Sequence, residues 1–316
     1  MDKKLDIITI GESLIELSTE NSLTKAEILN KYYGGDTLTT AVTALKLGSK
    51  VGFISRIGMD CFKDYLMESW IDVGLDISQV KPTEGTNGIY FIALNNSECG
   101  KKEFALYRKK TAATNLSIDD ISTEYIQNAS IIYATGITQS LSISAREAVK
   151  KSFKIAKDNN VKTAYDPNFS TLIWSKDEAK EAFDDIKDLI DIIFINSTRD
   201  GDIILESASI DNRIKYLHDL GISIVIVKST QEKGYWVSNN GKIEFIKFTN
   251  EKVINDTGAG DAFNGGVLHA ISSGMSPFKG VALASIVAGL QIKGLGAIKS
   301  IPNKEEVYSI FKGMYE

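Results

Sequence analysis

Cysteine and histidine are scarce in this chain of 316 residues, which has two of each. Cys61 and Cys99 lie in unrelated contexts and have neither metal-site spacing nor the numbers for a disulfide framework. His218 and His269 fall in separate predicted helices, which argues against a histidine metal centre or a Ser-His triad. We therefore expect a reducing, cytoplasmic compartment and no metal held by protein side chains alone.

Long apolar runs and an excess of basic residues are also lacking. No run approaches the roughly 18 to 20 apolar residues that a membrane helix needs. The first apolar stretch breaks at Gly11 and Glu12, too early for a signal-peptide core, so we expect a buried strand there. Lysine and arginine total 36 against 41 aspartates and glutamates, and they are dispersed. This pattern predicts neither a nucleic-acid nor a membrane partner.

Continuous runs rich in isoleucine and valine alternate with segments of helical pattern. Such runs are typical of strands buried on both faces of a parallel sheet. They predict one α/β domain over residues 1–316, with a doubly wound, mostly parallel sheet. In the first helix Asp36 is a plausible N-cap and Gly48 a plausible C′ residue. The predicted strands are 5–11, 50–58, 129–136, 161–166, 191–196 and 222–228, and the predicted helices are 36–48, 142–159 and 176–189.

Two segments, 12–35 and 84–108, alternate with period two and lack helical periodicity. We expect them to form short antiparallel strands outside the main sheet. Residues 235–246 predict a hairpin with a two-residue Asn-Gly turn. Ligands of open α/β sheets bind at the carboxyl ends of the strands, so the polar loops there are the first places to seek a site.

The most informative motif is NDTGAGDAFNGG, residues 255–266. Gly258, Ala259 and Gly260 are small enough to let backbone N–H groups approach an anion, at the start of a predicted helix. Asp261 is unexpected beside phosphate unless it has a chemical task. The natural task is to accept the proton of an attacking hydroxyl during phosphoryl transfer, with Mg²⁺ offsetting the local negative charge.

Two other interpretations of this motif are weaker. An ordinary glycine turn with Asp261 as a simple N-cap would not require the whole string. A dinucleotide site fits poorly, because the motif is near the C-terminus and no partner acid follows at βαβ spacing.

This motif resembles the C-terminal signature of the ribokinase-like (PfkB) carbohydrate kinases, and residues 32–60 resemble the N-terminal one. The resemblance covers essentially the whole chain. It implies ATP and Mg²⁺ as cofactors, Asp261 as the catalytic base, and an anion hole of Gly258, Ala259 and Gly260. It also implies a small β-sheet lid from 12–35 and 84–108 that often forms a homodimer interface. The residues implied in nucleotide binding are Asn196, Lys228, Thr257, Gly258 and Gly260.

Several strings are similar to those of 2-keto-3-deoxygluconate kinases, among them IGESLIELS, GGDTLTT and LYRKKTAA. This likeness implies a substrate with a carboxylate and a phosphorylated primary hydroxyl. Arg108 has the planar fork that binds a carboxylate bidentately. Tyr90 and Tyr107 taken alone could equally be an aromatic pair that packs a sheet. The expected substrate-binding residues are Gly34, Gly35, Asp36, Thr39, Tyr90, Tyr107, Arg108, Asp166 and Asn168.

The chain departs from the family pattern at four places. Thr39 replaces an asparagine, Ser170 replaces an arginine, and Arg199 replaces an acid near the metal and phosphates. The nucleotide loop at 228–234 reads KSTQEKG, without its first glycine. The departures leave three alternatives open: a related sugar or sugar acid as substrate, a fructokinase-like or nucleoside kinase specificity, or a degenerate kinase that acts as a ligand-binding regulator.

Overall fold

The main sheet of the computed structural model has nine strands, and the structure describes residues 4–93, 103–204, 208–248 and 253–315. The strand order is β13-β12-β11-β10-β9-β8-β1-β4-β5, and the antiparallel pairings of this sheet are β11 with β12 and β12 with β13. This is the predicted doubly wound, mostly parallel α/β sheet. Its strands are β1 (Leu5–Ile10), β4 (Val51–Gly58), β5 (Asp76–Thr83), β8 (Ala129–Thr135), β9 (Lys162–Asp166), β10 (Ile192–Asn196), β11 (Ile224–Ser229), β12 (Gly234–Asn239) and β13 (Lys242–Lys247).

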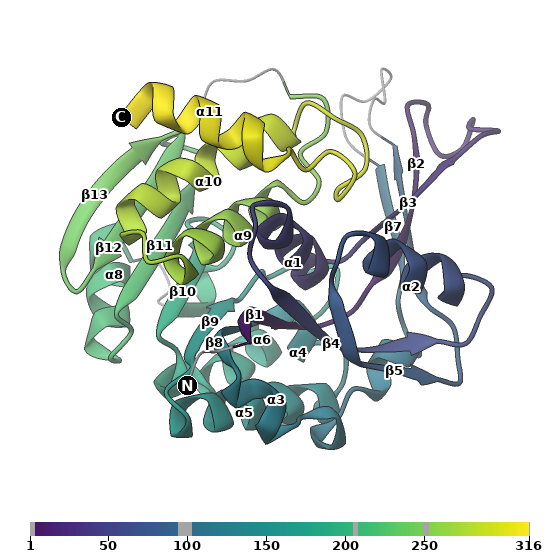
Figure 1. Cartoon of the computed structure of the whole chain (residues 1–316), viewed down its shortest axis with the longest axis horizontal. Helices are drawn as coiled ribbons and strands as arrows, with labels where there is room; N and C mark the ends of the chain where they lie inside the picture. Colours follow the sequence, from purple (N-terminus) through teal and green to yellow (C-terminus); the bar gives the residue numbers. More distant parts are fainter. Residues whose placement is uncertain (1–3, 94–102, 205–207, 249–252, 316) are drawn as a thin grey trace.

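Helices cover both faces of this sheet, as Figure 1 shows. Successive residues of β1 point to opposite faces: Ile7 packs in the core under α1, α9 and α10, and Ile8 packs under α5, α6 and α8. The helices are α1 (Asp36–Lys46), α2 (Lys63–Asp72), α3 (Thr123–Gln127), α4 (Gly136–Gln139), α5 (Ile143–Asp158), α6 (Lys176–Asp184), α7 (Gly201–Ile204), α8 (Ile210–Asp219), α9 (Ala259–Ser272), α10 (Pro277–Gln291) and α11 (Lys304–Tyr315).

A second, four-stranded sheet stands beside the first, at the upper right of Figure 1. This lid sheet has the order β3-β2-β6-β7 and therefore draws on both predicted segments. We expected only antiparallel pairing, but the two central strands, β2 and β6, pair parallel. Each enters the lid directly from the main sheet, so they run in the same direction. The strands are β2 (Leu14–Thr19), β3 (Asn30–Gly34), β6 (Gly88–Ala93) and β7 (Glu103–Tyr107); predicted lid residues 94–102 lie outside the described residues.

Most predicted elements are confirmed, and two local details are corrected. Asp36 is the first residue of α1 rather than its cap, because Gly35, with φ of 133°, takes the cap position. The predicted helix 176–189 ends at Asp184 and is followed by a short 3₁₀ turn. Gly48 follows the C-cap with φ of 112°, as predicted. In the part of the chain that is described, no helix has the length and apolarity needed to cross a membrane.

Candidate active site

The signature turn lies where α9 begins. Gly258 caps the helix in the left-handed region, with φ of 79°, and its carbonyl accepts the Ala262 N–H at 2.8 Å. The helix thus begins at Ala259, within the glycine turn, and Asp261 lies in its first turn. Backbone N–H groups of a first turn have no partner within the helix, so this end can bind an anion.

Two cavities meet at this turn. The lid-side cavity, of about 280 Å³, lies between the turn and the lid sheet, and the helix-side cavity, of about 760 Å³, lies toward β11, β12 and α10. Four residues line both cavities: Asn168, Arg199, Gly258 and Asp261. Two ligands placed one in each cavity would therefore meet at Asp261.

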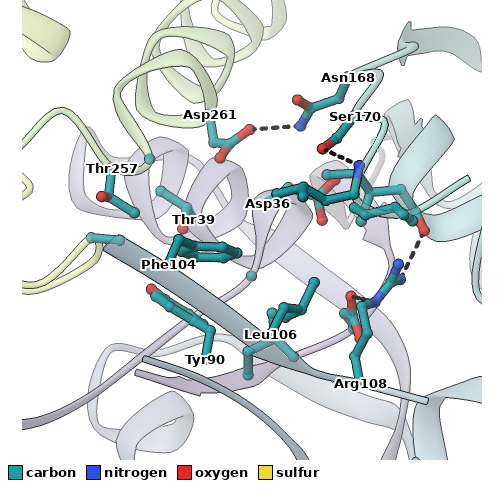
Figure 2. A pocket seen from close by; sticks show the side chains of 18 of the residues that line it. Asp36, Thr39, Tyr90, Phe104, Leu106, Arg108, Asn168, Ser170, Thr257 and Asp261 are labelled. Carbon is teal, nitrogen blue, oxygen red and sulfur yellow. Dashed lines mark hydrogen bonds and ion pairs between the residues drawn. The ribbon is translucent and has the colours of Figure 1, made fainter. Parts of the chain in front are cut away.

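The lid-side cavity joins a polar wall to an apolar one (Figure 2). Asp36, Thr39, Asn168 and Asp261 come from loops and helices at the carboxyl ends of the main-sheet strands. The lid contributes side chains that alternate to one face of its strands, and these are Leu14, Tyr90, Phe104 and Leu106.

Asp261 is half-buried, and its protein surroundings control its charge. Burial raises the pKa of this carboxyl to about 8, and the nearby carboxylates of Asp36 and Asp166 act in the same direction. Lys228 and Arg199 oppose the rise. Asn168 holds the carboxylate from the side, with its Nδ2 3.4 Å from Oδ1. A carboxyl with a raised pKa can take up a proton near neutral pH.

Asp166, predicted to bind substrate, lies beneath the cavities and lines neither of them. Its Oδ2 receives Lys228 Nζ at 2.6 Å and Asn264 Nδ2 at 2.7 Å, and its Oδ1 accepts the Asn168 N–H at 2.9 Å. The prediction for Asp166 is therefore corrected to a positioning contact: it fixes Lys228 and the loop that carries Asn168. Burial of the ion pair explains why these partners are needed.

Arg108 does line the lid-side cavity, but its guanidinium is already engaged. Nε is 2.8 Å from Glu12 Oε1, one terminal nitrogen donates to Ser140 Oγ at 3.0 Å, and the other donates to the Ile137 carbonyl at 3.0 Å. Figure 2 shows the Arg108 side chain beside Leu106, one of the apolar residues from the lid. These three contacts fix the orientation of the Arg108 guanidinium, and Glu12 balances its charge.

Two further substrate predictions concern residues outside the cavity lining. Tyr107 is 66 % exposed and packs its ring against Phe91, because its neighbours Leu106 and Arg108 take the cavity side of β7. That prediction is corrected. Gly34 touches the cavity only through Tyr90, whose hydroxyl would lie 2.8 Å from an added Cβ. Gly35, Asp36 and Thr39 line the cavity directly.

The helix-side cavity gathers most of the residues predicted for nucleotide binding. Asn196, Lys228, Gly258 and Gly260 line it, whereas Thr257 lines the lid-side cavity. Its far end is apolar, with the rings of Tyr235 and Phe263 stacked at 4.0 Å between centroids. The altered loop KSTQEKG connects β11 to β12, and Thr230 of this loop lines the cavity.

Comparison with known proteins agrees with this arrangement. The model of the pfkB family carbohydrate kinases matches residues 4–304. The chain belongs to this family. As a PfkB carbohydrate kinase it is a phosphotransferase, an ATP-dependent sugar kinase.

Relatives and solved structures cover almost the whole PfkB chain. A 2-dehydro-3-deoxygluconokinase of Thermoproteus tenax is 27% identical over 98% of this chain and 95% of its own. A 5-dehydro-2-deoxygluconokinase of Clostridium beijerinckii is 25% identical over 98% and 94%. A ribokinase II candidate from E. coli, solved with ATP and Mg²⁺, superposes with a TM-score of 0.88 at 22% identity, covering 98% of this chain and 100% of that one. At 22% identity, the similarity to the E. coli structure supports the fold alone.

The lining of the PfkB site suits an Mg²⁺ ion that would be bound through phosphate oxygens and water. Among the described residues, no three histidine, cysteine or acidic side chains converge to hold a metal. Asp256 and Asp261 line the helix-side cavity and can reach metal-bound water, which Mg²⁺ tends to retain. Arg199 stands at the junction where the family pattern has an acid, and it places a cation there.

Sequence reasoning missed several residues of this PfkB site. Glu12, Phe104, Leu106 and Ala297 line the lid-side cavity. Of these, Leu106 could have been found, because period-two alternation from Arg108 puts it on the same face. Asn264, which donates to Asp166, follows Asp261 by one helical turn, and that spacing was a usable signal.

Proposed function

We propose that the chain phosphorylates a hydroxyl of 2-keto-3-deoxygluconate or a related sugar or sugar acid, with Asp261 as general base. The observation that carries this proposal is the position of Asp261 in the first turn of α9, at the junction of the two cavities. An acceptor in the lid-side cavity and a nucleotide in the helix-side cavity would bring hydroxyl and phosphate together there.

In the proposed reaction, Asp261 accepts the proton of the acceptor hydroxyl as its oxygen forms a bond to the γ-phosphorus. The bond from that phosphorus to the bridging oxygen breaks, and ADP leaves. Asn168 orients the carboxylate. Gly258, Ala259 and Gly260, the predicted anion hole, all line the helix-side cavity, but the Ala259 N–H already donates to the Asp256 carbonyl at 3.2 Å. The N–H groups of Gly260 and Asp261 stabilise negative charge on the transferring group, together with Lys228 and Arg199. Bound Mg²⁺ supplies charge neutralisation on the phosphates.

The names of the relatives and the lining of the lid-side cavity support the proposed substrate class. Both relatives act, by their names, on dehydro-deoxygluconates. A cavity of about 280 Å³ suits a six-carbon acceptor. Its polar wall suits hydroxyl groups, and Leu14, Phe104 and Leu106 suit a carbon that lacks one. Arg108 is the cation available on the lid side for a carboxylate.

A homodimer through the lid is part of the proposal. The outer face of the lid sheet carries Leu17, Phe91, Ala105 and Tyr107, on the side opposite the cavity. These side chains are half-buried or exposed in the isolated chain, and Tyr107 is 66 % exposed. A second copy would cover this apolar face. Sedimentation of wild type and of Tyr107→Asp tests it: a dimer that the variant dissociates supports the lid interface.

ADP release with a panel of acceptors tests the proposed function. The panel contains 2-keto-3-deoxygluconate, 5-keto-2-deoxygluconate, gluconate, fructose, ribose and nucleosides, each also examined by thermal shift. Highest kcat/KM on a keto-deoxy acid supports the proposal. Highest kcat/KM on fructose or on nucleosides replaces the substrate class. Thermal shifts without turnover would instead support a ligand-binding regulator.

A further inference from the structure

Glu12 follows β1 and is a charged residue of the lid-side cavity with no task in the proposed mechanism. It is 1% exposed, and Oε1 is 2.8 Å from Arg108 Nε. Ser140 and Ile137 hold the other two nitrogens of the same guanidinium. The arginine that would recognise an acidic sugar is therefore neutralised by a carboxylate inside the site.

The charges around Glu12 oppose the entry of another anion. The cavity lining carries three carboxyl groups, from Glu12, Asp36 and Asp261, against the guanidinium groups of Arg108 and Arg199. The charged groups that face Glu12 are Arg108 and, from α1, Asp36. Ile137 of α4 and Ser140, which caps this helix, are neutral and bind Arg108. A substrate carboxylate at Arg108 would add a negative charge to a cluster that already contains three carboxyl groups, which opposes their ionisation.

We propose that Glu12 sets the charge selectivity of the acceptor site: an acidic sugar binds beside Arg108 together with one proton, which Glu12 holds, and a neutral sugar binds without it. The proton comes from solvent and converts the Glu12 carboxylate to a carboxyl group. The substrate carboxylate then replaces Glu12 as the anion that balances Arg108. This inference rests on the proposed function, because it concerns the same acceptor site.

The electrostatics of Glu12 support a proton at this position. Burial, with Asp36, raises the pKa of Glu12 to about 7 although Arg108 lowers it. A substrate anion near Arg108 raises this pKa further, so by linkage the acid binds more tightly at low pH. Above pH 7 the KM for an acid should rise by up to about tenfold per pH unit relative to the KM for a neutral sugar.

Isothermal calorimetry in two buffers of different ionisation enthalpy counts the protons taken up on binding. The ligands are 2-keto-3-deoxygluconate and fructose at pH 7.5. Because a group with a pKa of about 7 already holds about a quarter of a proton at pH 7.5, we expect an uptake of up to about three quarters of a proton for the acid and near none for fructose. Glu12→Gln, which keeps an oxygen for Arg108 Nε, should abolish the uptake and flatten the pH dependence of the acid's affinity. Ser140→Ala, which removes a neutral partner of the same guanidinium, should leave the uptake unchanged.

Equal proton uptake in wild type and Glu12→Gln would overturn the inference and assign the proton to Asp36 or Asp261. Binding of the acid to wild type without uptake would overturn it too, and this measurement does not depend on the folding of any variant. ADP release by the same wild-type protein keeps the two proposals apart. Turnover with 2-keto-3-deoxygluconate sustains the proposed function even where the proton uptake is missing. Proton uptake without turnover removes the kinase chemistry and leaves the inference about Glu12 standing.

Discussion

At the scale of single residues, Asp261 combines burial with a proton-accepting position. Replacing Asp261 by Asn keeps the shape and the contact with Asn168 but removes the acceptor for the hydroxyl proton. We expect kcat to fall about 10²- to 10⁴-fold, with ATP affinity retained. Steady-state kinetics and nucleotide titration measure both quantities. A variant with kcat close to wild type would remove Asp261 from the role of base.

Arg199 is the second residue whose effect can be isolated. A permanent cation at the junction of the cavities repels a metal ion and can bind phosphate in its place. Arg199→Glu restores the acid of the family pattern and should lower the Mg²⁺ concentration for half-maximal rate severalfold, by roughly 1 kcal/mol of interaction.

Arg199→Gln is the matched control, because it removes the cation without adding an anion. It should give an intermediate Mg²⁺ requirement. If wild type and both variants need the same Mg²⁺ and bind ATP equally, this departure is incidental. The altered loop at 228–234 then becomes the better explanation for any unusual nucleotide binding.

At the scale of elements, the start of α9 depends on a backbone conformation that glycine adopts freely. Gly258 has φ of 79°, and an added Cβ would lie 3.1 Å from the Cβ of Ala297. Gly258→Ala should cost about 1–2 kcal/mol of stability and also displace the first turn, with a loss of kcat. Urea unfolding and kinetics on the same preparation measure the two effects.

The same helix provides its own control at the other end. Gly274 has φ of 83°, and a methyl group there would meet no atom of the described residues within 4 Å. Gly274→Ala should lose a similar amount of stability and keep its kcat. If both variants lost stability equally and neither lost activity, the turn at Gly258 would have no role beyond folding.

Elements with strong local signals were predictable from the sequence. The isoleucine- and valine-rich runs gave the central strands to within two residues, and the Asn240-Gly241 turn joined β12 to β13 as expected. The antiparallel prediction for the lid failed because pairing direction depends on how each strand enters the sheet. Tyr107 was placed on the wrong face because alternation alone does not say which face of a strand meets the cavity.

The composition of the site was harder to predict than its central motif. Asp261 and its glycine turn are local in the sequence, so one string revealed them. The contact of Glu12 with Arg108 joins a loop of the main sheet to the end of a lid strand, and only the packing of the two sheets brings it about. Asp166 is an acidic residue at the carboxyl end of a strand, as a substrate-binding residue would be, yet its side chain points inward and binds Lys228.

At the scale of the whole molecule, buried carboxyl groups give stability a pH dependence. Burial raises the pKa of Asp261 to about 8, of Glu12 to about 7 and of Asp200 to about 6, above their values in an unfolded chain. The native state thus holds protons that the unfolded state has released. These three carboxyl groups therefore contribute a free energy of unfolding that falls as the pH rises from about 4 through 8, while buried His269, whose pKa is lowered to about 4, contributes in the opposite direction below about pH 6.5.

Asp261→Asn removes one of these carboxyl groups and therefore tests whether their ionisation causes the pH dependence of stability. At pH 8.5 the variant should be more stable than wild type by at least about 1 kcal/mol, and the difference should shrink below pH 5. Urea denaturation across this range measures it. If the free energy of unfolding changes with pH equally in both proteins, Asp261 is not a source of the pH dependence.

The parallel pairing of β2 with β6 also governs how the chain can acquire its structure. Between these two strands the chain returns to the main sheet and forms α1, β4, α2 and β5. The centre of the lid sheet therefore cannot form until that intervening unit has brought β6 beside β2. Closing so long a loop costs entropy before any lid contact compensates for it. We expect the amide protons of β2 and β6 to gain protection from exchange after those of β1 and β4 during refolding, so that the enclosed acceptor site is among the last parts to form.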